Sequence, residues 1–290
     1  MKIIQIMNPK AGHGHAENVH LSKETIIRYV TTAVGDAKRA VIDFCTQYDT
    51  EIHFIVCGGD GTINEVVNGI MDAKAADRAF FSVAPTGSGN DFVRNFKNEK
   101  KKNRIDLIKY NGKYAVNMIN IGFDCNVVEK TASYKNKKFI SGSMAYILGV
   151  GNVLLHKLGK DFKITLWDEN NAEINYNNTC LLTAIANGCF CGGGFNALPL
   201  AKLDDGLLDM LIVDKIGRGK FISLVGDYRK GTYIDKETRE IKPKFKSVLN
   251  YYKCKKIHIE GISEICADGE VEKADKIDIE VIPKAITFIG

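Results

Sequence analysis

The sequence predicts a chain of two unlike halves, an α/β domain followed by an all-β domain. Residues 2–7, 53–57 and 80–84 are short apolar runs typical of strands, with helix-like stretches between them. After about residue 120, runs such as DFKITLWD and KKIHIEG follow one another with turn residues between most of them. The alternation of strands and helices predicts a parallel sheet in the first half, and the successive strands predict an antiparallel sandwich or barrel in the second.

The elements of the first half follow from local patterns. The strand predicted at residues 2–7 is followed by NPKAG, whose Pro and Gly predict a loop. Residues 15–30 carry a helical pattern. Apolar positions at 63, 66, 67 and 70 predict a helix over residues 62–71, directly after the glycines that end the 53–57 strand. The charged run at 98–104 is expected to be a solvated loop.

The second half is expected to begin at residue 124, so that the domains are 1–123 and 124–290. Helices are predicted near 140–157 and 219–231, and the C-terminal tail is expected to pack back on the first domain. The predicted strands cover residues 161–168, 172–178, 179–188, 207–216, 255–261 and 276–290.

Composition favours a folded intracellular protein. The 290 residues are 45% hydrophobic, and 40 basic against 35 acidic residues give a net charge of +5. That mild excess favours anionic partners such as nucleotides or acidic lipid headgroups, without the basic patch of a nucleic-acid binder. Eight cysteines without a C-x-x-C pair, and no secretory signal, predict reduced thiols in the cytoplasm. The uncharged stretch 139–155 contains three glycines, so we expect a mostly buried helix rather than a membrane span.

Two glycine-rich loops carry the functional prediction. In CGGDGT at 57–62, glycines allow backbone N–H groups to approach a phosphate closely, and the following helix start adds unpaired donors. Asp60 would repel a phosphate unless a divalent cation lies between them or the carboxylate handles a proton. A tight turn is the alternative for this loop alone, but PTGSGNDF at 85–92 ends a neighbouring strand in the same way. The two loops are therefore expected to face each other across one cleft.

The order of these motifs resembles the diacylglycerol kinase catalytic family, which includes sphingosine kinases and soluble bacterial diacylglycerol kinases. NPKAG, GGDGT and PTGSGNDF are followed by IGFD at 121–124, GGGFNALPLAKLDDGLLD at 192–209 and DGE at 268–270, so the resemblance covers essentially the whole chain. It implies an N-terminal α/β domain like those of phosphofructokinases and NAD kinases, which binds the nucleotide. It also implies a C-terminal antiparallel β-sandwich domain, which binds the lipid substrate.

The resemblance also implies the site residues. Those that bind ATP are Asn8, Gly58, Gly59, Asp60, Gly61, Thr62, Thr86, Gly87, Ser88, Gly89 and Asn90. The acidic catalytic network, working through Mg²⁺ carried with the nucleotide, is Asp60, Asp91, Asp124, Asp268 and Glu270. The family's proposed general base matches Asp268, and a structural Mg²⁺ site matches Lys202, Asp205 and Leu207.

One departure from the family pattern concerns phosphate binding. The family commonly has Lys or Arg after the glycine of N-P-x-x-G, whereas this chain has His13, with Lys10 three residues earlier. A neutral imidazole compensates less phosphate charge than a fixed cation. Either Lys10 or another base compensates, or activity is lower.

The implied reaction transfers the γ-phosphoryl group of ATP to a lipid hydroxyl, with diacylglycerol as the default acceptor and phosphatidic acid as the product. Monoacylglycerol, a sphingoid base or a polyprenol would place similar demands on the cleft. The rival readings are an NAD kinase-like enzyme, which shares GGDGT, and a non-catalytic lipid- or nucleotide-binding relative. The expected partners are ATP, a neutral lipid with a free hydroxyl, the inner membrane surface in transient contact and a second copy of the chain, but no nucleic acid.

Overall fold

The computed structural model describes residues 1–12, 26–96, 101–122 and 159–290. Up to residue 122 its elements are β1 (Lys2–Met7), β2 (Ile26–Val30), α1 (Asp36–Gln47), β3 (Ile52–Gly58), α2 (Asp60–Asp72), β4 (Ala79–Pro85), the 3₁₀ turn η2 (Val93–Asn95), β5 (Lys102–Tyr110), β6 (Lys113–Ala115) and β7 (Met118–Gly122). The later elements are β8 (Lys160–Asp168), β9 (Glu173–Ala186), β10 (Leu208–Asp214), α5 (Arg218–Lys230), the 3₁₀ turn η3 (Pro243–Phe245), β11 (Leu249–Glu260), β12 (Glu264–Ala267), β13 (Glu270–Lys273) and β14 (Lys276–Ile289). His13, Asp124 and the 139–155 stretch lie outside the described residues.

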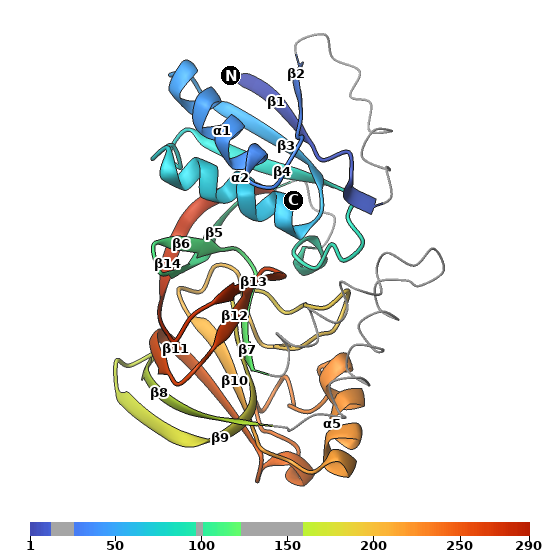
Figure 1. Cartoon of the computed structure of the whole chain (residues 1–290), viewed down its shortest axis with the longest axis vertical. Coiled ribbons are helices and arrows are strands. Elements are labelled where there is room, and N and C mark those ends of the chain that lie inside the picture. Colours follow the sequence, from blue (N-terminus) through green and yellow to red (C-terminus); the bar gives the residue numbers. More distant parts are fainter. Residues whose placement is uncertain (13–25, 97–100, 123–158) are drawn as a thin grey trace.

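The first half is a parallel sheet in the order β4, β3, β1, β2, with α1 and α2 packed beside it (Figure 1). Its core comes from alternate strand residues such as Ile4, Ile6 and Phe54, which are completely buried. The two helices approach closely at Gly69, where a Cβ atom would lie 2.8 Å from Val41 Cβ. The close packing of α2 against α1 holds this helix in place, with its first residue at the carboxyl end of β3.

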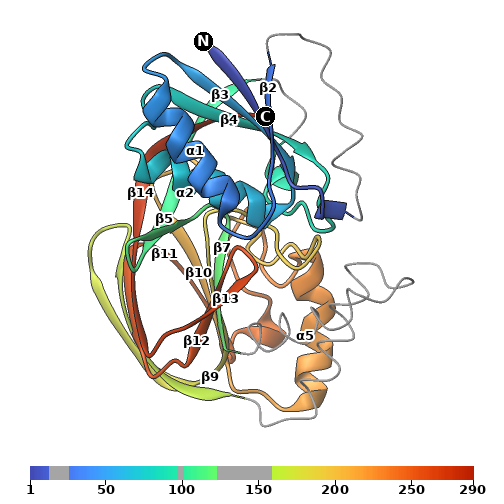
Figure 2. The ribbon, with the colours of Figure 1, turned by 45° about the horizontal axis from the view of Figure 1, so that its top comes forward.

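The second half is antiparallel and is buried on both faces of its central strands. In β10, Leu211 and Val213 join a cluster with the inner face of α5, while Met210 and Ile212 join another cluster with β11. The strand order runs β7, β9, β10, β11, and β8 pairs with both β9 and β11. Figure 2 shows α5 beside this layer, below the α/β half. The structure confirms the predicted fold class, an α/β domain with an antiparallel β-sandwich domain.

Strand β14 joins the two halves. Residues 276–280 pair with β11 of the sandwich, and residues 287–289 pair in parallel with β4 of the first half. The register shifts between these stretches, where the completely buried Asp106 of β5 accepts N–H donors from Lys284 at 2.6 Å and Gly206 at 2.7 Å. Burial raises the pKa of the Asp106 carboxyl. One continuous sheet thus runs through both halves.

Several local predictions need correction. Residues 26–30 form β2 instead of the end of a helix, because the run IIRYV pairs in parallel with β1. Residues 102–104 begin β5 instead of continuing a loop, since they pair with the end of β14. The two strands predicted over 172–178 and 179–188 are one long strand, β9. None of the helices in the described ranges has the length and apolarity required to cross a membrane.

Candidate functional site

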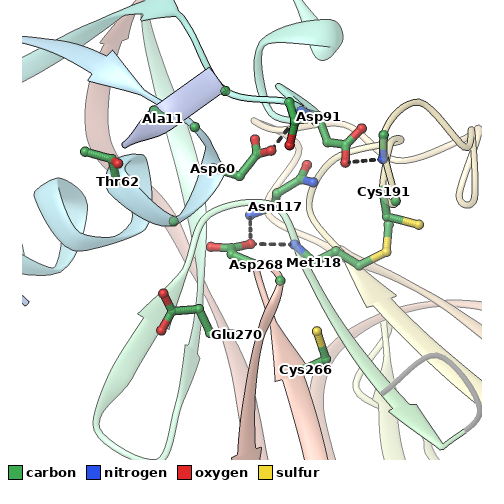
Figure 3. Close-up of a pocket in the computed structure, with 18 of the residues that line it drawn as sticks. Ala11, Asp60, Thr62, Asp91, Asn117, Met118, Cys191, Cys266, Asp268 and Glu270 are labelled. Carbon is green, nitrogen blue, oxygen red and sulfur yellow. Dashed lines mark hydrogen bonds between the residues drawn. The ribbon is translucent and has the colours of Figure 1, made fainter. Parts of the chain in front are cut away.

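A cleft of about 410 Å³ lies between the two halves, and both halves line it (Figure 3). From the first half come the loop after β1, the start of α2 and the loop after β4. From the second half come the segment 191–193 and the β12–β13 turn at Asp268, Gly269 and Glu270. The three loops that follow parallel strands meet here because the carboxyl ends of those strands share one edge of the sheet.

The two glycine loops touch each other through their glycines. A Cβ atom on Gly87 would lie 2.4 Å from the Cα of Gly59, closer than any side chain allows. A Cβ atom on Gly58 would lie 2.6 Å from the Oγ1 of Thr62. The Thr86 N–H also donates to the Gly58 carbonyl at 3.3 Å. The glycines are therefore required for the backbones to approach, as well as for access by a ligand.

Helix α2 presents its positive end to the cleft. Gly59 is its N-cap and supplies no side-chain hydrogen bond, so the first-turn N–H groups have no capping side chain. The Asn8 amide donates to the Thr62 hydroxyl at 3.1 Å, which fixes the loop after β1 against this turn. Unpaired amides and the helix dipole make such a terminus attractive to phosphate.

Asp60 fastens the second glycine loop from the start of α2. Its Oδ1 accepts the Phe92 N–H at 3.0 Å, and its Oδ2 accepts the Asp91 N–H at 3.2 Å. Each oxygen accepts one of these bonds, and a carboxylate oxygen has about two acceptor sites. Asp60 therefore positions the loop while retaining acceptor capacity.

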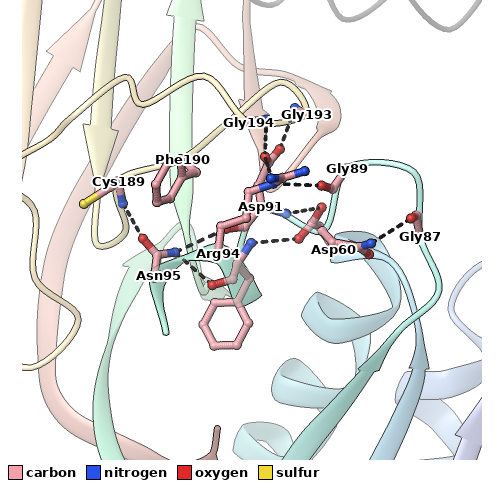
Figure 4. Close-up of polar contacts among 12 residues, drawn as sticks. Asp60, Gly87, Gly89, Asp91, Arg94, Asn95, Cys189, Phe190, Gly193 and Gly194 are labelled. Carbon is pink, nitrogen blue, oxygen red and sulfur yellow. Dashed lines mark hydrogen bonds and ion pairs between the residues drawn. The ribbon is translucent and has the colours of Figure 1, made fainter. Parts of the chain in front are cut away.

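Asp91 connects this loop to the sandwich half. Its oxygens accept the N–H groups of Gly193 at 2.8 Å and Gly194 at 2.7 Å (Figure 4). Burial raises the pKa of the Asp91 carboxyl, and the neighbouring Asp60 charge raises it further. The Oδ2 atoms of Asp60 and Asp91 lie 3.1 and 3.4 Å from the place of a Cβ on Gly89. The Arg94 guanidinium lies 3.7 Å from Asp91 Oδ1 and offsets part of this charge. The two carboxylates still retain acceptor sites, which suit a divalent cation.

Asp268 is held by four N–H donors. Its Oδ1 accepts the backbone N–H groups of Asn117 and Met118, both at 3.0 Å. Its Oδ2 accepts the Val116 N–H at 2.7 Å and the Asn64 side-chain amide at 2.8 Å. Burial raises the pKa of the Asp268 carboxyl, and these donors act in the opposite direction.

Glu270 lies two residues further on, at the start of β13, and is exposed to the cleft. Its Oε1 lies 3.4 Å from the place of a Cβ on Gly61, so it faces the first turn of α2. Partial burial raises the pKa of the Glu270 carboxyl, and the charges of Glu65, Glu272 and Asp268 add to the effect, while Lys113 lowers it.

Comparison with known proteins gives a family for this architecture. A family model described as "Diacylglycerol kinase catalytic domain" matches residues 2–121, and one described as "YegS C-terminal NAD kinase beta sandwich-like domain" matches residues 117–290. The chain belongs to the diacylglycerol kinase catalytic family. A Staphylococcus haemolyticus relative named "Putative lipid kinase" is 26% identical over 288 residues, covering 92% of this chain and 88% of the relative. A Staphylococcus aureus relative of the same name is 26% identical, with 91% and 88% coverage.

Solved structures share the fold. A crystal structure titled as a putative diacylglycerol kinase from Bacillus anthracis superposes with a TM-score of 0.73, at 24% identity, over 99% of this chain and 96% of that chain. A second Bacillus anthracis structure, titled as a diacylglycerol kinase, gives 0.68 at 22% identity with the same coverage. At identities of 24% and 22%, the superpositions show a shared fold and nothing further.

In this family member the cleft gathers most of the residues expected from sequence. The expected residues that line it are Asn8, Gly59, Asp60, Gly61, Thr62, Gly87, Ser88, Gly89, Asp91, Asp268 and Glu270. Gly58, Thr86 and Asn90 do not line it and support the loops instead. Asn90, with a left-handed φ of 53°, donates its side-chain amide to the Gly87 carbonyl at 2.8 Å.

The expected structural Mg²⁺ loop lies away from the cleft, and its contacts do not favour a divalent cation. The Lys253 ammonium contacts Asp205 Oδ2 at 2.8 Å and Asp209 Oδ2 at 3.1 Å. The other oxygen of Asp205 accepts the Leu207 N–H at 3.2 Å. A lysine thus already neutralises the carboxylate that was expected to bind metal together with the main chain of Lys202 and Leu207. Within the described ranges, no group of three or more His, Cys, Asp or Glu side chains is arranged to hold a metal.

Sequence reasoning missed three asparagines that organise the cleft. Asn64 donates to Asp268, and Asn117 donates to the Phe190 carbonyl at 2.6 Å. Asn95 accepts the Cys189 N–H at 2.7 Å and donates to Asn117 Oδ1 at 3.2 Å. Asn64 follows GGDGT within one helical turn, and that proximity was the available signal. Nothing local predicts the long-range bonds of the other two, from Asn117 to Phe190, 73 residues away, and from Asn95 to Cys189, 94 residues away.

Proposed function

We propose that the protein is an ATP-dependent lipid kinase that transfers the γ-phosphoryl group to a lipid hydroxyl, with diacylglycerol as acceptor and phosphatidic acid as product. The observation that carries the proposal is the cleft itself. Two touching glycine loops, an uncapped helix start and the Asp60–Asp91 pair meet there against the sandwich half. The family supports a kinase, and the names of the relatives support a lipid acceptor.

The nucleotide side of the cleft would bind the phosphates of ATP. Gly61 and Thr62 line the cleft in the first turn of α2, so a phosphate bound at this helix start would meet backbone N–H groups. Asn8 holds the neighbouring loop against that turn. Tight positioning and charge stabilisation supply most of the rate in phosphoryl transfer, because the transition state is loose. The close contact between Gly59 and Gly87 would set that position.

Asp60 and Asp91 are the residues that would hold Mg²⁺ carried with ATP. When bound, Mg²⁺ neutralises the charge that develops on the phosphate oxygens. The chain itself contributes two carboxylates that are already fixed by backbone amides, so they need no reorganisation on binding. Burial, and after it repulsion from Asp60, raises the pKa of Asp91, and a cation would relieve the repulsion.

The sandwich side would receive the acceptor. Met118, Cys191 and Cys266 contribute apolar atoms to the cleft and extend it away from the helix start (Figure 3). A neutral lipid headgroup could place its hydroxyl between these side chains and the nucleotide. Since such a lipid resides in a bilayer, the protein would work in the cytoplasm in transient contact with the inner membrane surface.

The test is a product assay with the full-length chain, Mg²⁺ and γ-labelled ATP. Mixed micelles would each carry one acceptor: diacylglycerol, monoacylglycerol, a sphingoid base or a polyprenol, with NAD in a separate reaction. Mass spectrometry should identify phosphatidic acid from diacylglycerol, and Asp60→Ala should abolish it. Phosphorylated NAD would favour an NAD kinase, and ATP binding without any phosphorylated product would favour a non-catalytic binding protein.

A further inference from the structure

The hydrogen bonds of Asp268 use all of its acceptor capacity. Two N–H donors meet each carboxylate oxygen, from Val116, Asn117, Met118 and the Asn64 side chain. A carboxylate has about four lone-pair sites, so no site remains for a substrate hydroxyl unless a donor leaves. The displaced donor would then lose a charge-assisted bond in a partly buried place.

These donors come from elements far apart in the chain. Asn64 belongs to α2, and residues 116–118 precede and begin β7, about 150 residues before Asp268. The Asp268 N–H also donates to the Met118 carbonyl at 2.9 Å, and Asp268 has a left-handed φ of 47°. The carboxylate therefore holds the β12–β13 turn against both halves of the molecule.

The carboxylate of Glu270 differs from that of Asp268 in its hydrogen bonding and in its position. Its carboxylate accepts no hydrogen bond from any residue in the described ranges, and it lines the cleft beside the first turn of α2. Besides burial, the charges that act on its carboxylate are those of Glu65 on α2, Glu272 on its own strand, Asp268 in the turn and Lys113 on β6. Three acids against one base favour uptake of a proton by Glu270.

We propose that Glu270 accepts the proton of the acceptor hydroxyl, and that Asp268 is a positioning residue that aims Glu270 through its bonds to Asn64 and the amides of residues 116–118. The proposal rests on the lipid kinase function proposed above. It differs from the role that the family resemblance implies for Asp268.

The step balances within the substrates and the chain. The acceptor O–H bond breaks and its proton moves to a Glu270 oxygen. The hydroxyl oxygen forms a bond to the γ-phosphorus, while the bond from that phosphorus to the bridging oxygen breaks and ADP leaves with the electron pair. Glu270 then returns its proton to water, which restores the carboxylate.

The experiment compares Glu270→Gln with Asp268→Asn in full pH–rate profiles and in thermal unfolding. Glu270→Gln should lower kcat about 10²- to 10⁴-fold, leave KM for ATP within about twofold, and remove the fall in kcat on the acid side. Its Tm should match that of the wild type, because no hydrogen bond is lost. The matched control is Glu280→Gln, a strand glutamate with a half-exposed side chain whose ion pair is with Lys109, and its activity should be unchanged.

Asp268→Asn should lower Tm and raise KM for ATP and lipid, while its residual activity keeps the acid-side fall. Asn tolerates the left-handed backbone, so the loss isolates the carboxylate. Asn64→Ala removes one donor and should move Tm and KM in the same direction by less, which preserves the test if Asp268→Asn does not fold.

Two results would overturn the assignment. One is a Glu270→Gln enzyme with wild-type kcat and an intact acid-side fall. The other is an Asp268→Asn enzyme with wild-type Tm in which that fall is lost. A wild-type chain that binds ATP but phosphorylates no lipid would instead refute the proposed function.

Discussion

The aspartates on the two sides of the cleft belong to similar glycine-containing turns but are held differently. Asp60 and Asp91, on the glycine loops, each accept one backbone N–H per oxygen and retain sites for a cation. Asp268, in the turn on the sandwich side, accepts two donors per oxygen and retains none. A motif therefore supplies the carboxylate, whereas its surroundings decide whether the carboxylate can act on a ligand.

Asp60→Asn should reduce activity the most, because Asp60 retains acceptor sites for a cation. The change removes a charge from the cation pair and turns an N–H donor toward the amide of Asp91 or Phe92. We expect kcat for lipid phosphorylation to fall about 10³-fold, since charge stabilisation dominates this reaction. Steady-state kinetics would measure it, with the exposed helix residue Asp43 changed to Asn as control. Wild-type kcat in Asp60→Asn would show that its spare acceptor sites are irrelevant.

The Asp205–Asp209 pair is a third case, because a lysine neutralises these carboxylates in place of amides or a cation. Lys253→Met should destabilise the protein by about 3–5 kcal/mol, since it strands the Asp209 carboxylate, whose side chain is 0% exposed. Urea unfolding would measure the loss.

Because Lys253 already neutralises this site, removal of divalent ions with EDTA should leave the Tm of the wild type unchanged. A clear fall in Tm on chelation would restore the metal site expected at Lys202, Asp205 and Leu207.

Gly87→Ala tests whether the glycine loops must touch for Asp60 and Asp91 to meet. The new Cβ would lie 2.4 Å from Gly59 Cα, so the loops must separate. We expect KM for ATP to rise roughly tenfold, a modest positional effect. Gly226→Ala is the matched control, because a Cβ there meets nothing within 4 Å on α5 and should be neutral or slightly stabilising. Equal KM values in the two variants would contradict the role of the contact.

Asp36→Asn should have the smallest effect on activity, because the Asp36 carboxylate lies outside the cleft and has a structural role. The Thr32 N–H, ahead of the Tyr29, Thr32 and Arg39 side chains, lowers the pKa of Asp36 from 3.8 to about 2. A lowered pKa stabilises the folded state above the ordinary value, and that stability is lost as pH falls from about 4 to about 2. Asp36→Asn should therefore be less stable than the wild type at neutral pH, with the gap closing over that window and kcat unchanged. Denaturant unfolding at several pH values would reveal a constant gap if the interpretation is wrong.

Sequence reasoning worked best where the signal is local. The β3–α2–β4 segment was predicted because glycine loops interrupt strong apolar periods there, and the same loops predicted the nucleotide side of the cleft. It failed at Ile26–Val30 and at the start of β5, where strand pairing with β1 and β14 overrides helical or polar local pattern. It also divided β9, since residues 173–179 are exposed or half-buried and mostly polar, whereas residues 180–186 are all buried.

Local sequence patterns predict the fold class, the family and half of the residues that line the cleft, because these depend on periodicity, glycine placement and motif order within short windows. The chemistry open to the acids depends instead on contacts between residues far apart in the chain. Asp91 meets its donors 102 and 103 residues away, and Asp268 meets donors 150 to 204 residues away. Hydrogen-bond capacity is consumed by whichever donors folding brings near, and that pairing has no local signature in the chain.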